Sequence, residues 1–332
     1  MSTPETLRVH LATDPSESGH YRLDRERFEN AGKAFPDAFG RLRPTYSDDE
    51  AGFVRGVRDA DVLIGWKFPR PGLAERAPKL RWVQLIGAGV DHLYPLDWLP
   101  ASVKLITASG VHTKKSFEYV LMGLIALHTR LPRIAEHQRA RTWKKIQTGT
   151  LPGKTALVIG LGAVGTGAAE AARTLGMRVL GVRRTARPHR FVDELFGPGD
   201  LPAALPRADY VVLAAPLTSD TREILGEREL ALLPEGAGVV NLGRGRLVNQ
   251  AALEAGLRSG RLGGAFLDVV WPEPHPPEST LWDAPNLFIT PHVGADDIEN
   301  YIPAVFSIAL DNMARFFAGR RLRNVVDRRR GY

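Results

Sequence analysis

The sequence contains no cysteine in its 332 residues. Disulfide bonds, thiolate metal ligands and cysteine nucleophiles are therefore excluded from its fold and its chemistry. A chain without cysteine suits a reducing compartment, so we expect a cytoplasmic protein.

Long hydrophobic runs are also absent. The longest apolar stretch, residues 119–127, is much shorter than the roughly 20 residues that a membrane-spanning helix needs. Residues 1–11 lack a charged segment followed by an apolar run, which is the pattern of an export signal. We therefore expect a soluble, unexported protein that does not bind membranes.

Negative charge is in deficit, because 44 Lys and Arg residues face 37 Asp and Glu residues, for a formal net charge of +7. This balance favours anionic ligands. The positive residues are scattered, and the densest run, residues 320–330, is at the C-terminus, where basic runs are commonly solvated. No DNA-reading module or basic stripe with interleaved aromatic residues is visible, so we expect no nucleic acid partner.

Short apolar segments alternate with helical patterns along the chain, which predicts an α/β fold with parallel sheets covered on both faces. The length predicts two domains. The predicted strands are residues 7–12, 62–65, 82–86, 103–107, 156–159, 179–182, 210–214, 238–242, 264–267 and 287–290.

Apolar residues at helical spacing predict two long helices. One spans residues 116–131, and we expect Pro132 to end it. The other spans residues 298–317 and is followed by Gly319, a typical helix terminator. The spacing alone does not indicate which sheet the second helix covers.

A glycine-rich turn joins a predicted strand to a predicted helix in residues 154–182. Gly160, Gly162 and Gly165 occupy the G-x-G-x-x-G positions of a dinucleotide-binding turn. They would allow a tight bend, room for a pyrophosphate, and close packing of helix on strand, respectively. The pattern predicts a Rossmann site for a nicotinamide dinucleotide.

Positive charge is expected around the dinucleotide phosphates. The amides of Ala163 and Val164 would open the helix that faces the pyrophosphate. Arg183, Arg184 and Thr185 follow the next strand, where an NAD-binding unit commonly carries a carboxylate for the ribose hydroxyls. A guanidinium can bind a 2′-phosphate, so we favour NADP(H); surface arginines with NAD(H) as cofactor remain the alternative.

Three downstream stretches carry polar residues at the ends of predicted strands: N-L-G-R-G-R-L-V-N at residues 241–249, F-L-D-V-V-W-P-E-P at residues 266–274 and I-T-P-H-V-G-A at residues 289–295. The carboxyl ends of parallel strands lie at one edge of a sheet, where open α/β folds bind ligands. We therefore expect a candidate active site there.

Together these stretches resemble the D-isomer-specific 2-hydroxyacid dehydrogenase family, in particular its glyoxylate/hydroxypyruvate reductase-like branch. Further matching stretches are A-D-V-L-I-G at 60–65, L-R-W-V-Q-L-I-G-A-G-V-D-H-L at 80–93, S-G-V-H-T-K at 109–114 and N-V-V-D at 324–327. The resemblance implies two Rossmann-like domains, one flavodoxin-like for the substrate and one for NAD(P), with the active-site cleft between them. It predicts residues 1–107 and 298–332 as the substrate domain, residues 108–297 as the dinucleotide domain, and a homodimer formed through the helix at 116–131.

The resemblance also implies three catalytic residues: Arg244 binds the substrate, His292 donates the proton, and Glu273 is its acidic partner. The chemistry of these groups agrees. Reduction of a 2-oxo acid needs a proton for the developing alkoxide, which an imidazole can supply near neutral pH. A neighbouring carboxylate favours the imidazolium form, and a guanidinium can hold the substrate carboxylate or polarise its carbonyl group.

Further contacts are implied for the substrate and the cofactor, and no metal site is expected. The glycine-rich turn of Gly87, Ala88 and Gly89 can expose amides to the substrate carboxylate, and Lys67 can meet a second anionic group. Asp268 matches the family residue that contacts the nicotinamide carboxamide. Ala215, Pro216, Thr221, Leu242, Gly243 and Gly294 complete the expected cofactor site.

The leading functional hypothesis is reversible, NAD(P)H-dependent reduction of a small 2-oxo acid, such as glyoxylate or hydroxypyruvate, to the D-2-hydroxy acid, with NADPH preferred. One alternative is an NAD-linked dehydrogenase of a bulkier 2-hydroxy acid. Another is a non-catalytic protein of the same fold that senses dinucleotides. We interpret His112, which lies beside Gly110 and Val111, as a structural residue.

Overall fold

The computed structural model describes residues 4–14, 16, 19–185 and 187–332. The first three residues of the stretch in which we expect no export signal lie outside these ranges. The chain divides into two compact units, unit 1 (Met1–Val111 and Asp297–Tyr332) and unit 2 (His112–Asp296). The divisions follow residues 111 and 296, whereas the sequence analysis places them after residues 107 and 297.

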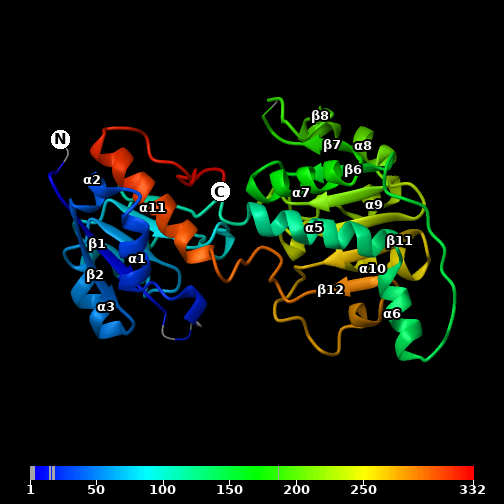
Figure 1. Ribbon diagram of the computed structural model, residues 1–332, viewed down its shortest axis with the longest axis horizontal. Coiled ribbons are helices and arrows are strands. Elements are labelled where there is room, and N and C mark those ends of the chain that lie inside the picture. The colour runs from blue at the N-terminus through cyan, green and yellow to red at the C-terminus, as the bar shows by residue number, and fades with distance from the viewer. Residues whose placement is uncertain (1–3, 15, 17–18, 186) are drawn as a thin grey trace. The chain divides into compact units, whose positions relative to one another are not determined.

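Unit 1 contains a sheet of five parallel strands in the order β2-β1-β3-β4-β5 (Figure 1). The sequence analysis predicts four of them but not β2, an edge strand whose sequence L-R-P-T-Y-S has no apolar run. Because β2 precedes it, the strand that ends before Trp66 is the third along the chain, whereas it is the second among the predicted strands. The strands are β1 Leu7–Ala12, β2 Leu42–Ser47, β3 Val62–Gly65, β4 Trp82–Leu85 and β5 Lys104–Ile106.

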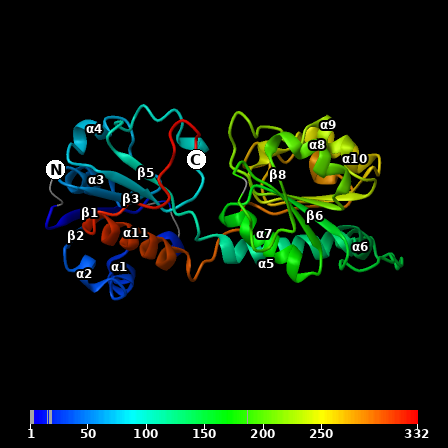
Figure 2. The same cartoon turned by 90° about the horizontal axis from the view of Figure 1, so that it is seen from above.

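Helices cover both faces of this sheet. Figure 2 shows α1 (Arg25–Gly32), α2 (Pro36–Phe39) and α11 (Tyr301–Phe317) on one face, and α3 (Glu50–Val57) and α4 (Leu73–Arg76) on the other. The C-terminal helix α11 thus completes unit 1, as the family resemblance implies. It packs the predicted apolar stripe against β1. Six residues of the stripe are buried, namely Ile302, Val305, Phe306, Ala309, Leu310 and Met313, whereas Phe317 at the end of the helix is only partly buried.

The start of α11 differs from the prediction by three residues, 301 in place of 298. The Asp297 carboxylate accepts hydrogen bonds from the amides of Glu299 (3.1 Å) and Asn300 (3.0 Å). Such a side-chain turn offers the backbone an alternative to helix, so the helix begins after it.

Unit 2 contains seven parallel strands in the order β12-β11-β10-β9-β6-β7-β8. The chain order reverses where β6 pairs with β9, which is the switch point at which doubly wound sheets bind ligands. The short edge strand β8 is not predicted from the sequence. The strands are β6 Thr155–Ile159, β7 Arg178–Val182, β8 Glu194–Phe196, β9 Tyr210–Leu213, β10 Ala237–Asn241, β11 Leu262–Leu267 and β12 Leu287–Ile289.

Alternate residues of these strands face two helical layers. Leu157 and Ile159 pack toward α8 (Leu201–Ala204), α9 (Glu227–Leu232) and α10 (Gln250–Arg258), whereas Ala156 and Val158 pack toward α5 and α7 (Figure 2). Here α5 spans Thr113–His128 and α7 spans Ala163–Thr174. Within the described ranges, no helix is both long enough and apolar enough to pass through a membrane.

The predicted helix 116–131 is wrong at both ends, since α5 covers residues 113–128. Arg130 has a left-handed φ of 57°, which interrupts the helical path. A second helix, α6 (Leu131–Arg139), then begins with Pro132 in its first turn, where proline is tolerated because no amide is needed. Pro132 therefore opens a helix rather than ending one.

Candidate active site

The glycine turn after β6 leaves no room for side chains at two of its three glycines. Gly160 has a φ of 92°, and a Cβ there would lie 2.6 Å from the backbone of Ala215, which follows β9. A Cβ at Gly165 would collide with the carbonyl oxygen of Gly160. These two glycines therefore give the tight bend and the close helix-to-strand approach that the sequence predicts.

Open space surrounds the third glycine. A Cβ at Gly162 would meet no atom within 4 Å. Gly162 is also the N-cap of α7, and no side chain caps the helix. The amides of Ala163 and Val164 open that helix, so the residues present fit the pyrophosphate of a dinucleotide.

Basic groups gather after β7. The amide of Arg183 donates to Phe196 in β8 (3.1 Å), and its half-buried side chain forms no ion pair with a carboxylate in the described part of the chain. Arg184 and Thr185 are exposed. His189, which no sequence pattern indicates, shares a hydrogen bond of 3.1 Å between its ring and the hydroxyl of Thr166 in α7.

The pKa of His189 is lowered by burial and by neighbouring positive charge. Burial lowers the pKa, and the charges of Arg183 and Arg190 lower it further. His189 therefore tends to be neutral.

The loops after β6, β9 and β10 meet, and they contain most of the other predicted cofactor residues. A Cβ at Gly243 would lie 3.0 Å from the carbonyl oxygen of Ala215. In the loop after β9, the hydroxyl of Thr221 donates to the carbonyl of Pro216 at 2.6 Å. Leu242 is buried, so its side chain supports this edge of the sheet.

Arg244 is held at its backbone by a residue that the sequence analysis misses. The fully buried Asn241 donates from its side-chain amide to the carbonyl of Arg244 (2.9 Å) and accepts from the amide of Gly243 (3.0 Å). A polar residue at the end of β10, directly before the G-R-G stretch, is the only sequence signal for this role.

His292 and Glu273 are in direct contact. Nδ1 of His292 lies 2.8 Å from Oε2 of Glu273, and both side chains are partly exposed. The hydrogen bond to Glu273 raises the pKa of His292 against the opposing effect of burial. Burial alone would raise the pKa of Glu273, but the hydrogen bond and charge of His292 leave it lowered. The pair therefore favours imidazolium and carboxylate.

The loop that carries His292 is fixed by the buried Asp268. One carboxylate oxygen accepts from the hydroxyl of Thr290 (2.6 Å) and the amide of Val293 (3.0 Å), and the other accepts from the amide of Gly294 (2.8 Å). His292 has a φ of 55°, a left-handed conformation that costs a non-glycine residue about 1 kcal/mol or more. Asp268 thus positions the loop, a role that its match to a nicotinamide contact does not predict.

Arg244 acts electrostatically on both members of the pair. Its charge lowers the pKa of His292 and of Glu273. His112 also belongs to this group. Burial lowers its pKa, with smaller effects of Arg244 and His292, and its Nδ1 lies 2.9 Å from the carbonyl oxygen of Ala295.

The remaining predicted substrate residues are in unit 1. Gly87 follows β4 and is buried, while Ala88 and Gly89 are partly exposed. A Cβ at Gly87 would lie 2.5 Å from the ring of Trp66, so this indole covers the turn. Lys67 extends into solvent and pairs with Asp14 at 3.5 Å.

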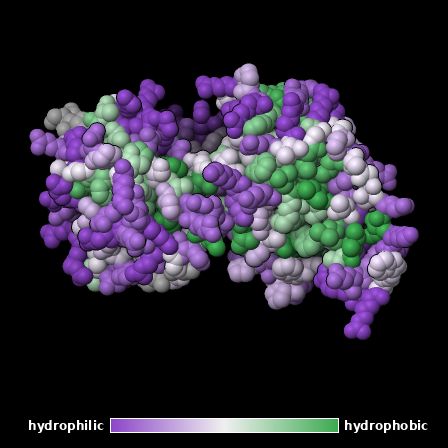
Figure 3. Space-filling view, in the orientation of Figure 1, coloured by the Kyte–Doolittle hydropathy of each residue, from purple (hydrophilic) through white to green (hydrophobic). Residues whose placement is uncertain are grey.

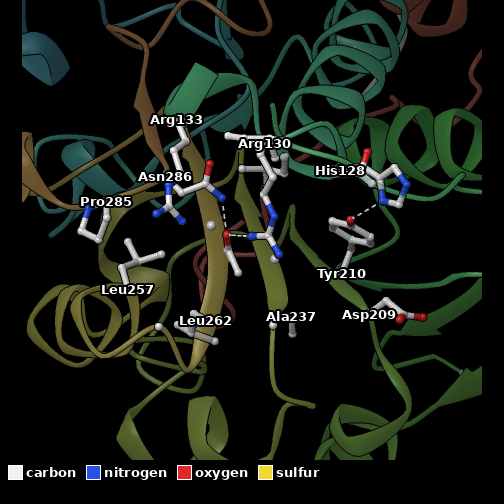
Figure 4. Close-up of a pocket in the computed structure, with 18 of the residues that line it drawn as sticks. His128, Arg130, Arg133, Asp209, Tyr210, Ala237, Leu257, Leu262, Pro285 and Asn286 are labelled. Carbon is white, nitrogen blue, oxygen red and sulfur yellow. Dashed lines mark hydrogen bonds between the residues drawn. The ribbon is translucent and has the colours of Figure 1, made fainter. Parts of the chain in front are cut away.

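A pocket lies at the amino-terminal edge of the unit 2 sheet, opposite the edge that carries the predicted catalytic residues (Figure 4). Its volume is about 800 Å³, and its walls include His128, Arg130, Tyr210 and Asn286. Arg130 and Asn286 both donate to the carbonyl of Gly263. The predicted catalytic residues do not line this pocket. Across the described residues, no cluster of three or more His, Asp or Glu side chains could hold a metal ion.

Comparison with known proteins gives a family match over half of the chain. The model described as "D-isomer specific 2-hydroxyacid dehydrogenase, NAD binding domain" matches residues 121–294, which lie within unit 2. A glyoxylate reductase of Thermococcus gammatolerans is 33% identical over 253 residues, which is 72% of this chain and 75% of that protein.

Two solved structures are similar over nearly the whole chain. A D-isomer specific 2-hydroxyacid dehydrogenase of Xanthobacter autotrophicus, in complex with NADPH and MES, has a TM-score of 0.83 and 30% identity. An NADPH-dependent glyoxylate/hydroxypyruvate reductase of Sinorhizobium meliloti, in complex with NADP and sulfate, has a TM-score of 0.81 and 33% identity. Each comparison covers 98% of this chain and 100% of the other.

Proposed function

The chain belongs to the D-isomer specific 2-hydroxyacid dehydrogenase family of NAD(P)-dependent oxidoreductases, and from this membership we propose that it reduces a small 2-oxo acid. The substrate is of the glyoxylate or hydroxypyruvate kind, the product is the D-2-hydroxy acid, and the reaction is reversible. The observation that carries the proposal is the 2.8 Å contact between His292 and Glu273.

His292 is the proposed general acid. A bound nicotinamide dinucleotide supplies the hydride to the carbonyl carbon. Protonated His292 gives its proton to the substrate oxygen as negative charge develops there, and Glu273 stabilises the imidazolium before the transfer. In the oxidation direction, neutral His292 accepts the hydroxyl proton. The lowered pKa of Glu273 keeps it ionised in both directions.

Arg244 and the turn at Gly87, Ala88 and Gly89 are the proposed anion-binding groups. The guanidinium of Arg244 orients the substrate through its carboxylate or carbonyl oxygen, and the turn contributes backbone amides. The Trp66 ring over Gly87 supports a small substrate, because it limits the space above the turn. Lys67 is the proposed contact for a second anionic group.

NADPH is the proposed preferred cofactor. Arg183, Arg184 and Thr185 follow β7, and a guanidinium can pair with the ribose 2′-phosphate. The two solved relatives that contain NADPH or NADP support this choice. The loops with Ala215, Pro216, Thr221, Leu242, Gly243 and Gly294 would hold the rest of the dinucleotide, and Asp268 would meet its carboxamide.

A homodimer through unit 2 is also proposed. Met122 and Ile125 in α5 are 44% and 45% exposed, and Leu131 and Ile134 in α6 are 44% and 39% exposed. Figure 3, in the orientation of Figure 1, shows hydrophobic side chains gathered where α5 lies. Exposed apolar side chains that gather on one surface are typical of protein interfaces.

Steady-state kinetics with a panel of 2-oxo acids of increasing size, and with NADPH and NADH, tests this proposal. We expect the highest kcat/KM with a two- or three-carbon acid and NADPH. We expect His292→Ala to lower kcat by roughly 10²- to 10⁴-fold without loss of NADPH binding. Higher kcat/KM with NADH and a bulky acid would favour the alternative dehydrogenase, and absence of turnover despite NADPH binding would favour a dinucleotide sensor.

A further inference from the structure

The segment that carries Glu273 is fastened by a residue outside the proposed catalytic set. Gln250 is the first residue of α10. Its side-chain amide nitrogen donates to the carbonyl of Trp271 (2.6 Å), and its amide oxygen accepts from the amide of Trp271 (2.7 Å). One carboxamide therefore satisfies both main-chain groups of a residue two positions before Glu273.

Arg246 holds the same tryptophan from its ring. The guanidinium lies 3.6 Å from the ring centroid of Trp271, in cation–π geometry. Next to Arg246, Gly245 packs against the backbone of Val270 so closely that a Cβ would collide with it. We call the contacts of Gln250 and Arg246 with Trp271 the Trp271 clamp.

Burial cannot replace the Trp271 clamp. Val270 is only 6% exposed, but the chain then leaves the core, and residues 271–274 are all exposed. Within this exposed turn, Glu273 receives one hydrogen bond from the amide of Val270 at 3.2 Å. Polar contacts must therefore determine where the Glu273 carboxylate lies.

The helix side of the Trp271 clamp is rigid. Asn249 caps α10 by accepting from the amide of Ala252 at 3.0 Å. Leu253 and Leu257 anchor the helix in the core, with exposures of 0% and 3%. Gln250 thus projects from a fixed element onto a turn that has little other support.

We propose that Gln250 is a positioning residue that, through the Trp271 clamp, holds Oε2 of Glu273 within hydrogen-bonding distance of Nδ1 of His292. The inference rests on the proposed function, in which His292 is the general acid. The clamp also joins the segment after Arg244 to the segment before Glu273, so it couples the placement of the guanidinium to that of the carboxylate.

The first test compares Gln250→Leu with the wild-type enzyme. The variant removes both hydrogen bonds at similar side-chain volume. We expect about a 10-fold lower kcat for 2-oxo acid reduction and an unchanged KM for NADPH. We also expect reduction to be lost at a lower pH than in the wild type. Ala251→Leu, at the exposed neighbouring position in the same helical turn, is the matched control and should retain the wild-type profile.

The second readout does not depend on turnover. The His292 imidazole is followed by NMR from pH 5 to 9, with its signal assigned from the His292→Ala variant. We expect it to titrate at lower pH in Gln250→Leu than in the wild type. If Gln250→Leu does not fold, Arg246→Leu, which removes only the stacking, replaces it and should shift the titration in the same direction.

The outcomes separate the two proposals. A wild-type titration of His292 in the folded clamp variant overturns the positioning role, even if kcat falls. Full turnover by His292→Ala overturns the proposed function instead. The titration of His292 then still shows whether the Trp271 clamp determines the Glu273–His292 contact.

Discussion

The contact between His292 and Glu273 gives the proposed reaction a defined pH dependence. The hydrogen bond that His292 donates to Glu273 raises the pKa of His292, and reduction requires the protonated ring. Reduction should therefore persist through neutral pH and be lost as pH rises through the raised pKa. Oxidation requires the neutral ring, so it should be lost as pH falls through the same pKa.

Replacing Glu273 should shift the pH at which reduction is lost and the pH at which oxidation is lost. In Glu273→Gln the imidazolium loses its charged partner, so we expect the pKa of His292 to fall and kcat/KM for reduction near neutral pH to drop by roughly 10- to 100-fold. The measurement is kcat/KM against pH in both directions. Glu278→Gln, at an exposed glutamate in the same loop, is the control. Identical pH profiles of the wild type, Glu273→Gln and Glu278→Gln would contradict the prediction.

The residues that act through the backbone could not be predicted from the sequence. Short local motifs indicate the glycine turn (Gly160, Gly162 and Gly165) and the loop that carries Arg244. Asn241 and Gln250, by contrast, have no pattern of their own, because their partners are the main-chain groups of loops whose paths depend on the fold. Their roles follow from the three-dimensional path of those loops.

At the scale of elements, β1 and β2 are joined by a buried histidine. His10 in β1 is fully buried, and its ring nitrogens lie 2.9 Å from the hydroxyl oxygens of Thr45 and Ser47 in β2. Burial lowers the pKa of His10 from 6.5 to about 4. The neutral ring can donate through one nitrogen and accept through the other, which suits two hydroxyl groups.

This pairing should make stability depend on pH. Because the folded-state pKa is below the unfolded value, the contribution is complete above pH 6.5 and is lost as pH falls toward 4. Between pH 7 and pH 5 we expect the free energy of unfolding to fall by about 2 kcal/mol more in the wild type than in His10→Gln. Urea unfolding at both pH values measures these free energies. An equal loss of unfolding free energy in the wild type and in His10→Gln would contradict the prediction.

Elements with strong periodicity were predictable, whereas β2 and β8, one edge strand of each sheet, were not. The buried stripe of α11 and the central strands of both sheets follow from apolar spacing alone. The edge strands β2 and β8 bury fewer side chains, so their sequences lack the apolar run of a central strand. The break at Arg130 depends on one left-handed residue, which the spacing of α5 does not reveal.

At the scale of the whole molecule, the exposed apolar side chains of α5 and α6 predict self-association. We expect the purified protein to sediment as a dimer and Ile125→Glu to shift it toward the monomer, because the charge would be buried in the interface. The matched control is Val54→Glu on α3, since Val54 is 40% exposed and Ile125 is 45% exposed. A monomeric wild type, or dimers of unchanged affinity in Ile125→Glu, would contradict the prediction.

Unit 1 is built from both ends of the chain, and α11 covers one face of its sheet. During synthesis, all of unit 2 leaves the ribosome before α11 does. Until then the side chains of Leu7, Val9 and Leu11 on β1 lack their covering helix. The translation of α11 therefore determines when β1 can reach its native state, and a chain that stops before α11 would expose an apolar sheet to aggregation.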